Sequence, residues 1–177
     1  METRTTGGPG TDDLLAEVER RVRAVPDPEI PVITIDDLGV IRDVQRVEDG
    51  LRVTITPTYS GCPAMQAMAD AVLEVGRRAG VPVEVVTRLA PAWTTDWMSE
   101  QGRESLRRFG IAPPTGERPH TSGSAGAVGL TLQRRQVTCP LCGSPDTEEL
   151  ARFGSTACKA LRRCLSCREP FDEFKSI

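Results

Sequence analysis

The sequence predicts an α/β fold, an α+β sandwich with the element order α-β-β-α-β-α, followed by a small four-cysteine ribbon. Apolar residues recur every three or four positions in residues 11–25 and 63–79, which indicates amphipathic helices, and a short third helix is expected over residues 99–109, closed by Gly110. The turn signal Asp49-Gly50 indicates a β-hairpin, because apolar residues precede it at Val40, Ile41, Val44 and Val47 and alternate with polar residues after it. Two Cys-x-x-Cys pairs in residues 136–177 indicate a metal-bound module, because so short a segment rarely folds on an apolar core alone.

Composition divides the chain into four segments. Residues 1–10 are rich in Gly and Thr and are expected to form a disordered tail. Residues 11–112 carry the α/β pattern, and residues 113–135 are a Pro-, Gly- and Ser-rich stretch typical of a flexible linker. Residues 136–177 are left for the ribbon. We therefore expect one ordinary domain joined to one small module.

The helices and strands of residues 11–112 have recognisable ends. Thr11 or Asp12 can cap the first helix, which Pro26 stops, and a proline-rich loop follows at residues 27–31. The hairpin is expected over residues 38–56, where Leu51, Val53 and Ile55 alternate with Arg52, Thr54 and Thr56 and give one buried and one wetter face. A strand over residues 81–89 separates the second helix from the third.

Composition excludes several classes of enzyme. His120 is the single histidine and lies in the linker, so the chain cannot supply the two Glu-x-x-His helices of a di-iron oxygenase or a three-histidine zinc site. No phosphate-binding loop of the Walker type is present. The chain is therefore not expected to be an enzyme by itself, and its six cysteines point to thiol or metal chemistry.

The expected location is the cytoplasm. The first residues contain no apolar run that could act as a secretory signal, and no stretch approaches the 18 apolar residues of a membrane span. Six cysteines in such a chain are expected to be reduced thiols or metal ligands. A net charge of −3 gives no electrostatic reason to expect nucleic acid, which disfavours a DNA-binding ribbon.

The strongest motif is the pair Cys139-x-x-Cys142 and Cys164-x-x-Cys167. The two-residue gap lets one tight turn point two thiolates at the same ion, and two such turns complete a tetrahedral site. Structural Zn²⁺ suits this symmetric pattern best, and an iron–sulfur cluster is the alternative. Cys158 is either a small apolar residue packed on the ribbon or an additional or alternative ligand.

Cys62 stands apart from the other cysteines. It follows Gly61 and precedes Pro63, which opens the second helix, so its sulfur is expected near a helix N-terminus, where a thiolate is stabilised. Cys62 is thus either a buried structural cysteine or a reactive, iron-binding thiol. The acids Asp27, Glu29 and Asp37 are expected in loops nearby.

The segments DPEIPVITIDDLGVIRDV and TPTYSGCPAM resemble the iron–sulfur cluster assembly domain family (SufT-like domains) over residues 12–112. Further segments, PAWTTDWMSEQGRESLRRFGIAPP, CPLCGS, FGSTACKALRRC and EPFDEFK, resemble the PaaD-like family of phenylacetate degradation, whose members carry a fused ribbon. The resemblance implies an accessory factor that assembles or delivers a metal centre, di-iron or iron–sulfur, of the multicomponent phenylacetyl-CoA epoxidase.

The resemblance also implies roles for residues and partners. Cys62, with Asp27, Glu29 and Asp37, becomes the candidate carrier of transient iron or an iron–sulfur cluster, which a homodimer could share. The expected partners are the oxygenase or reductase subunits, with no nucleic acid and no membrane. The alternative is a zinc-ribbon adaptor that bridges subunits without carrying iron.

Overall fold

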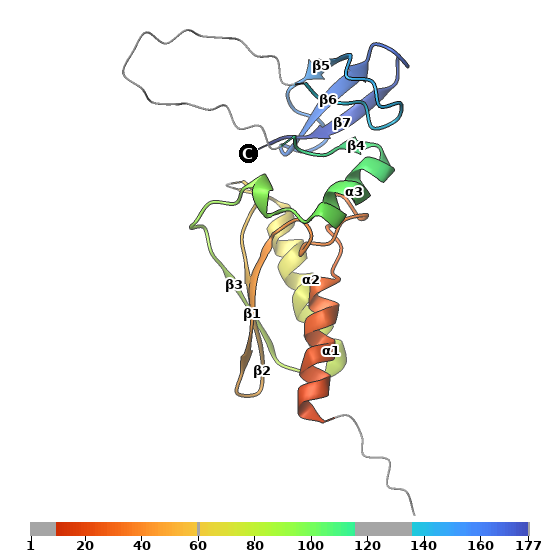
Figure 1. The fold of residues 1–177 in the computed structure, drawn as a ribbon. Helices are drawn as coiled ribbons and strands as arrows, with labels where there is room; N and C mark the ends of the chain where they lie inside the picture. The colour runs from red at the N-terminus through yellow and green to blue at the C-terminus, as the bar shows by residue number, and fades with distance from the viewer. Residues whose placement is uncertain (1–9, 60, 116–135, 177) are drawn as a thin grey trace, which may run out of the picture. The chain divides into compact units, whose positions relative to one another are not determined.

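The computed structural model describes residues 10–59, 61–115 and 136–176 (Figure 1). The chain divides into two compact units between Trp93 and Thr94. Most of the predicted tail and linker, with His120, lies outside the described residues. The predicted fold class is confirmed, because the first unit and the start of the second follow the order α-β-β-α-β-α and a cysteine-rich ribbon comes last.

The first unit is a three-stranded sheet with both of its helices on one face (Figure 1). Its elements are α1 (Thr11–Arg23), β1 (Ile41–Val47), β2 (Gly50–Ile55), α2 (Ala64–Ala79) and β3 (Val83–Thr87). The strand order is β1-β2-β3, with β1 antiparallel and β3 parallel to β2. Parallel neighbours need a long connection, which α2 provides.

Aliphatic side chains form the core between this sheet and its helices. The inward residues of β2 are fully buried, as are one or more residues on each helix. These residues are Leu51, Val53 and Ile55 from β2, Val18 and Val22 from α1, and Met68 and Val72 from α2. The spacings of two in the strand and four in the helices are those expected from the sequence, since these periods place side chains on one face.

The start of α1 differs from the prediction. Gly10 is its N-cap, and no side chain caps the helix, so the expected capping by Thr11 or Asp12 is wrong. Asp12 and Asp13 still lie in the first turn, where a negative charge favours the helix dipole. The end of α2 is as expected, because Gly80 adopts a left-handed φ of 67° there.

The hairpin turn is displaced by one residue from the predicted Asp49-Gly50. Val47 pairs with Gly50, so Glu48 and Asp49 form the turn and Gly50 opens β2. The glycine is required by a close approach, because a Cβ at Gly50 would lie 2.0 Å from the carbonyl oxygen of Pro82. A tertiary contact therefore explains this glycine.

The second face of the hairpin is only partly wet. Arg52 is exposed and pairs with Glu84 at 2.7 Å, as expected of the solvent face. Thr54 and Thr56 are buried, however, and the prediction of a wetter face fails at these two positions. Both threonines line a pocket whose other walls include Arg42 and the segment that follows β3.

The second unit joins a short helix to a four-stranded sheet. Its elements are the 3₁₀ turn η1 (Thr95–Trp97), α3 (Glu100–Phe109), β4 (Ile111–Ala112), β5 (Thr147–Ala151), β6 (Lys159–Cys164) and β7 (Pro170–Phe174). The strand order is β4-β7-β6-β5, with β4 parallel to β7 and the other pairs antiparallel. The sequence predicted a ribbon in residues 136–177 but located neither β4 nor β7.

The division into units differs from the predicted boundary at residue 112. The compact second unit begins at Thr94 and contains α3 and β4 together with the ribbon. The reason is strand pairing, since Ile111 pairs with Asp172 and Ala112 with Glu173, both in β7. Residues before the predicted linker thus complete the sheet of the ribbon.

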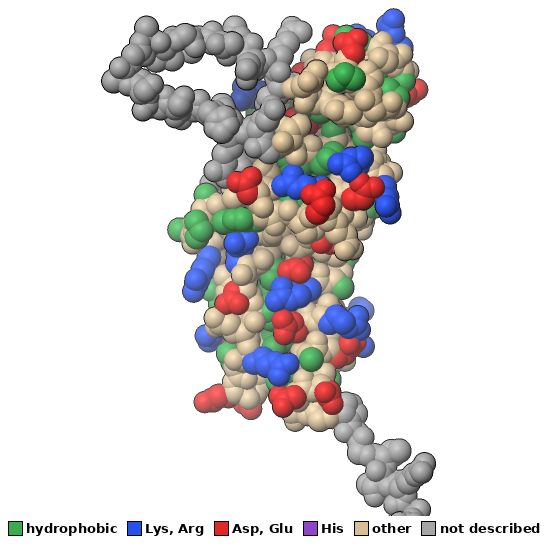
Figure 2. All heavy atoms as spheres, viewed as in Figure 1, with side chains coloured by type: hydrophobic (Ala, Val, Ile, Leu, Met, Phe, Trp, Pro, Cys, Tyr) green, Lys and Arg blue, Asp and Glu red, His purple; other side chains and the backbone are tan. Residues whose placement is uncertain are grey.

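Each of the three α-helices carries the motif Glu-x-x-Arg-Arg on its surface. The glutamate pairs with arginines three and four residues later, an arrangement that places opposite charges side by side on one face of the helix. The pairs join Glu17 to Arg20 and Arg21, Glu74 to Arg77 and Arg78, and Glu104 to Arg107 and Arg108. Much of the arginine content is therefore neutralised locally, and Figure 2 shows the resulting mixture of both charges. In the described parts of the chain, no helix combines the length and apolar character needed to cross a membrane.

Candidate metal centre

The four predicted ribbon ligands meet at one point. The sulfur atoms of Cys139, Cys142, Cys164 and Cys167 all lie within 4.8 Å of one another. Two of the distances are 3.9 Å, between Cys139 and Cys167, and 3.5 Å, between Cys142 and Cys164. A tetrahedral zinc with Zn–S bonds of about 2.3 Å needs S···S distances of about 3.8 Å. The four thiolates therefore fit one tetrahedral metal ion, and this group is a metal-binding site.

Two turns with the same hydrogen bonds present these sulfurs. In the first, the amide of Gly143 donates to the carbonyl of Cys139 at 2.9 Å. In the second, the amide of Arg168 donates to the carbonyl of Cys164 at 3.1 Å. Gly143 has a φ of 74° and Arg168 a φ of 69°, so both turns close through a left-handed residue four positions after a cysteine. A glycine four residues after Cys139 is a recognisable turn signal in the sequence. The second turn has an arginine at the same position, so the sequence gives no such signal there.

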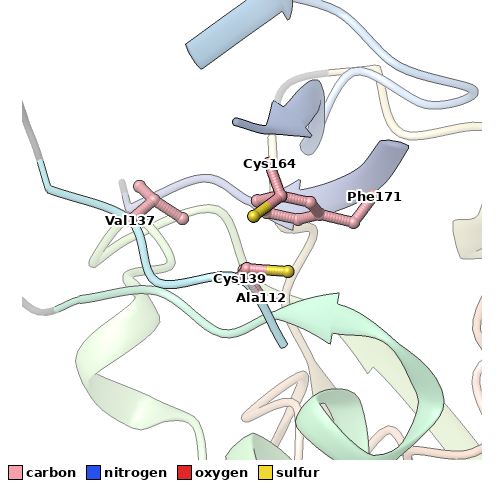
Figure 3. Close-up of a cluster of buried hydrophobic side chains, with 5 residues drawn as sticks. All are labelled: Ala112, Val137, Cys139, Cys164 and Phe171. Atoms are coloured by element: carbon pink, nitrogen blue, oxygen red, sulfur yellow. The ribbon is translucent and has the colours of Figure 1, made fainter. Parts of the chain in front are cut away.

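The inner side of the metal centre is apolar. Cys139 and Cys164 are buried in a cluster with Ala112, Val137 and Phe171, whose side chains are drawn in Figure 3. Cys167 packs against this cluster, while Cys142 is exposed. Sequence reasoning missed the three surrounding residues because they come from β4, β7 and the segment before the first cysteine turn.

Hydrogen bonds and burial give three of the ligand thiols, Cys142, Cys164 and Cys167, different pKa values. The backbone amide of Cys167, 3.5 Å from the sulfur of Cys164, lowers the pKa of Cys164 to about 6. The backbone amide of Glu169 lowers the pKa of Cys167, but burial and the neighbouring cysteine sulfurs outweigh it and raise that pKa to about 12. In the same way, the backbone amide of Ser144 lowers the pKa of Cys142. The contact with Cys164 and burial outweigh this effect, so the pKa of Cys142 is raised overall. In the metal-free state at neutral pH Cys164 is thus a thiolate while Cys142 and Cys167 are protonated, and a metal ion displaces those two protons.

Cys158 lies outside this group of ligands. It is buried, and its sulfur is 3.0 Å from the hydroxyl oxygen of Thr156. The four ligand sulfurs gather without it. This position agrees with the interpretation of Cys158 as a small apolar residue packed on the ribbon.

Cys62 lies just before α2, as expected. It is half-buried, its amide donates to the carbonyl of Tyr59 at 3.2 Å, and the preceding Gly61 has a φ of 83°. Pro63 is the N-cap of the helix and its side chain offers no cap. The thiol therefore stands at the start of a 16-residue helix, where the dipole favours a negative charge.

The three predicted carboxylates belong to one folded loop between α1 and β1. Asp27 is buried, and its Oδ1 accepts hydrogen bonds from the amides of Glu29 at 2.9 Å and Ile30 at 2.7 Å. Asp37 is half-buried, and its Oδ2 accepts a hydrogen bond from the hydroxyl of Thr34 at 2.8 Å. Two of the acids thus hold the loop in shape.

The structure does not bring the four carrier candidates together around one ion. Within the described ranges, three or more potential ligand atoms gather only at the ribbon cysteines. The carrier site therefore remains a prediction for Cys62, Asp27, Glu29 and Asp37.

Trp93 belongs to the core of the first unit, where it is buried and donates its indole N–H to the carbonyl of Leu38 at 3.0 Å.

Sequence comparisons assign a family to each half of the chain. The profile of the iron–sulfur cluster assembly protein family matches residues 15–86. The profile of the PaaD zinc beta ribbon domain matches residues 123–175. The two matches cover the regions that carry Cys62 and the four ribbon cysteines.

Two relatives in sequence agree with these profiles. A "Putative 1,2-phenylacetyl-CoA epoxidase" subunit from Escherichia coli (strain K12) is 48% identical over 162 residues, which are 91% of this chain and 92% of the relative. An "Fe-S protein maturation auxiliary factor" of Porphyromonas gingivalis (strain ATCC BAA-308 / W83) is 39% identical over 93 residues, 51% of this chain and 88% of the relative. A crystal structure of the domain of unknown function DUF59 from Bacillus anthracis shares 27% identity, covers 54% of this chain and 92% of its own, and has a TM-score of 0.48.

The resemblance noted in the sequence is thereby confirmed. The two profile matches, the four-sulfur centre and the nearly full-length identity all agree. The chain belongs to the PaaD family, the family of this E. coli epoxidase subunit, in which an iron–sulfur cluster assembly domain is followed by a zinc β-ribbon.

Proposed function

We propose that the chain is a non-catalytic accessory factor of phenylacetate degradation that helps to assemble or deliver a metal centre of the phenylacetyl-CoA epoxidase. The observation that carries this proposal is the 48% identity to the E. coli epoxidase subunit across 91% of the chain. The likeness of the first unit to a maturation auxiliary factor supports the maturation role. The work would take place in the cytoplasm, with the oxygenase or the reductase subunit as the client.

In this proposal the ribbon holds one structural Zn²⁺. Four protein sulfurs complete its coordination and leave no open position for a substrate, which is the arrangement of structural zinc sites. Zinc also supplies no redox chemistry. The ribbon residues would therefore fix a surface for docking the client, while the metal links the two cysteine turns.

The carrier role belongs to Cys62 with the carboxylates Asp27, Glu29 and Asp37. A half-buried thiol at a helix start can ligate iron or a cluster as a thiolate, and a single protein thiolate releases its cargo readily. A homodimer would supply a second Cys62 and complete a shared site. Release is needed because the cargo must pass to the client.

A specific observation favours the second candidate, an adaptor that bridges subunits without carrying iron. Asp27 and Asp37 accept hydrogen bonds within their own loop, and those bonds would compete with iron for the carboxylate oxygens. The two candidates differ only in whether the first unit binds cargo. They can be separated by removing the thiol.

The test is the variant Cys62→Ser, purified without oxygen after expression with the epoxidase subunits. The carrier role predicts that the variant keeps its zinc but loses bound iron, and that the epoxidase made beside it loses activity and iron. The matched control is Cys158→Ala, which removes a buried thiol outside the four-sulfur group and is expected to keep zinc, iron and client activation. Wild-type iron and client activity in Cys62→Ser would reject the carrier role and leave the adaptor.

A further inference from the structure

A pocket on the first unit is separate from the candidate carrier residues. It has a volume of about 270 Å³ and is lined by Arg42, Asp43, Thr54, Thr56, Arg88, Ala90 and Pro91. Its floor is the face of β2 turned away from the buried Val53 and Ile55, and its walls come from β1 and from the segment after β3. The volume is slightly below the range typical of drug-sized ligands, so the pocket suits a small molecule or a single functional group.

Thr56 gives the first sign of a ligand. Its side chain is only 2% exposed, and its hydroxyl oxygen has no hydrogen-bond partner in the structure. Buried hydroxyl groups are almost always satisfied, because an unpaired one loses its bonds to water without replacement. A hydroxyl that is both buried and unpaired in the lining of a pocket indicates a partner that enters from outside the chain.

The charges of the pocket indicate the sign of that partner. The lining contains two arginines, Arg42 and Arg88, and one carboxylate, Asp43, so it carries a net positive charge. The guanidinium of Arg88 forms no ion pair or hydrogen bond within the described parts of the chain. Arg42 donates to the carbonyl of Gly39 at 3.3 Å, and Asp43 accepts from the side-chain amide of Gln45 at 2.7 Å. The bond from Gln45 leaves the Asp43 carboxylate charged, so the two guanidiniums exceed it by one positive charge in the lining.

We propose that this pocket binds a small oxyanion, the phosphate or carboxylate group of a small molecule. Guanidinium groups match both anions through paired N–H donors, and these charge-assisted bonds are the strong ones among hydrogen bonds. The Thr56 hydroxyl donates the additional bond that it lacks in the free protein. Ala90 and Pro91 form an apolar wall beside the anion, where the carbon part of a ligand can rest.

The proposal is independent of the maturation role and is tested by direct binding. Inorganic phosphate and, separately, acetate are titrated into the full-length zinc-loaded protein, and the backbone amides and threonine methyl groups are followed by NMR. Saturation at concentrations on the order of 1 mM is expected for one of the two anions, with the largest shifts at Thr54, Thr56 and Arg88. The better anion identifies the group, a tetrahedral phosphate or a planar carboxylate.

Variants connect the binding to the pocket. Thr56→Val keeps the shape of the side chain and removes only the hydroxyl, and Arg88→Gln removes one charge from an exposed residue. Each is expected to weaken binding about tenfold, while Thr56→Ser restores it. Because the hydroxyl is unpaired without a ligand, Thr56→Val is expected to unfold no earlier than the wild type in anion-free buffer.

The matched control is Arg52→Gln. Arg52 is on the same face of the sheet and pairs with Glu84, outside the pocket, so this variant should bind within about twofold of the wild type. The proposal is overturned if neither anion binds saturably. It is equally overturned if Thr56→Val and Arg88→Gln bind as well as Arg52→Gln does.

Discussion

Gly143 and Arg168 occupy equivalent positions in the two cysteine turns. Each lies four residues after a ligand, donates its amide to the carbonyl of that ligand, and has a left-handed φ, 74° for the glycine and 69° for the arginine. Left-handed backbone costs an ordinary residue about 1–2 kcal/mol and a glycine almost nothing. One turn is therefore relaxed and the other is strained, although both present ligands to the same four-sulfur site.

Substitutions at these two positions are expected to act in opposite directions. Gly143→Ala should destabilise the metal-bound ribbon by about 1 kcal/mol through the backbone alone, because a Cβ there meets nothing within 4 Å. Arg168→Gly should stabilise it by somewhat less than about 1 kcal/mol, since the glycine also loosens the unfolded chain. Denaturant unfolding of the zinc-loaded protein measures both. Destabilisation by Arg168→Gly would show that the arginine side chain, and not its backbone, matters to the turn.

In the metal-free ribbon the thiols should ionise at widely different pH values. The pKa of Cys164 is about 6 and that of Cys167 about 12, so one thiolate should form near pH 6 and at least one thiol should stay protonated well above pH 9. Thiolate absorbance measured against pH, with Cys164→Ser as the reference, checks both steps. A single ionisation step at about pH 8.5 for all the thiols would show that the turns form only around the metal.

The same pKa values fix the sign of the pH dependence of zinc binding. At pH 7 Cys142 and Cys167 carry protons and Cys164 does not, so zinc binding should release at least two protons. Below about pH 6 Cys164 is also protonated, and its proton is released in addition. Zinc affinity should therefore fall more steeply with decreasing pH below pH 6 than above it. Calorimetry in buffers of different ionisation enthalpy counts the protons, and an unchanged count on either side of that pKa would contradict the assignment.

A buried ion pair between β6 and β7 should be sensitive to the loss of either partner. Arg162 and Glu173 are both buried, and a guanidinium nitrogen lies 2.9 Å from the carboxylate. Glu173→Ala leaves the arginine charge buried and should destabilise the second unit by about 3–5 kcal/mol. The double variant Arg162→Met with Glu173→Leu should recover most of this loss, because it removes both buried charges of the pair.

Denaturant unfolding followed at the amides of β6 and β7 measures the effect. The matched control is Arg163→Met, at the next residue of β6, whose exposed pair with Glu148 should contribute less than about 1 kcal/mol. Equal losses in Glu173→Ala and in the double variant would mean that packing, rather than an unpaired charge, sets the cost.

Asp27 offers a way to separate its structural role from the proposed ligand role. Asp27→Asn keeps an oxygen for the amides of Glu29 and Ile30, so its stability should stay within about 1 kcal/mol of the wild type, whereas Asp27→Ala should lose about 1–3 kcal/mol. If the carboxylate also holds iron, Asp27→Asn should bind less iron while remaining folded. Thermal unfolding and iron content of the same samples give both results, and full iron binding by Asp27→Asn would remove Asp27 from the carrier site.

Local patterns in the sequence were enough for the elements that each segment forms by itself. The segments expected as helices became α1, α2 and α3, and Ser99 and Gly110 mark the ends of α3 by their own conformational preferences. The ribbon ligands were predictable for the same reason. A two-residue spacing already directs Cys139 and Cys142, and likewise Cys164 and Cys167, towards one ion.

Contacts between distant segments were not predictable. The two residues of β4 are too few to show any period, and they form a strand only because β7 pairs with them. Gly50 was assigned to the turn, although it is explained by Pro82, and Thr56 was expected to be wet, although the segment after β3 helps to cover it.

The sequence alone therefore determined the fold class, the family resemblance and the four sulfur ligands, because each rests on spacing within a short segment. Tertiary structure decided which strands complete the ribbon sheet, which acids hold their own loop, and where an unpaired hydroxyl and two arginines line the same pocket. These features depend on burial and pairing between residues far apart in the chain. These interactions form only when the chain folds, so they cannot be predicted from a local sequence pattern.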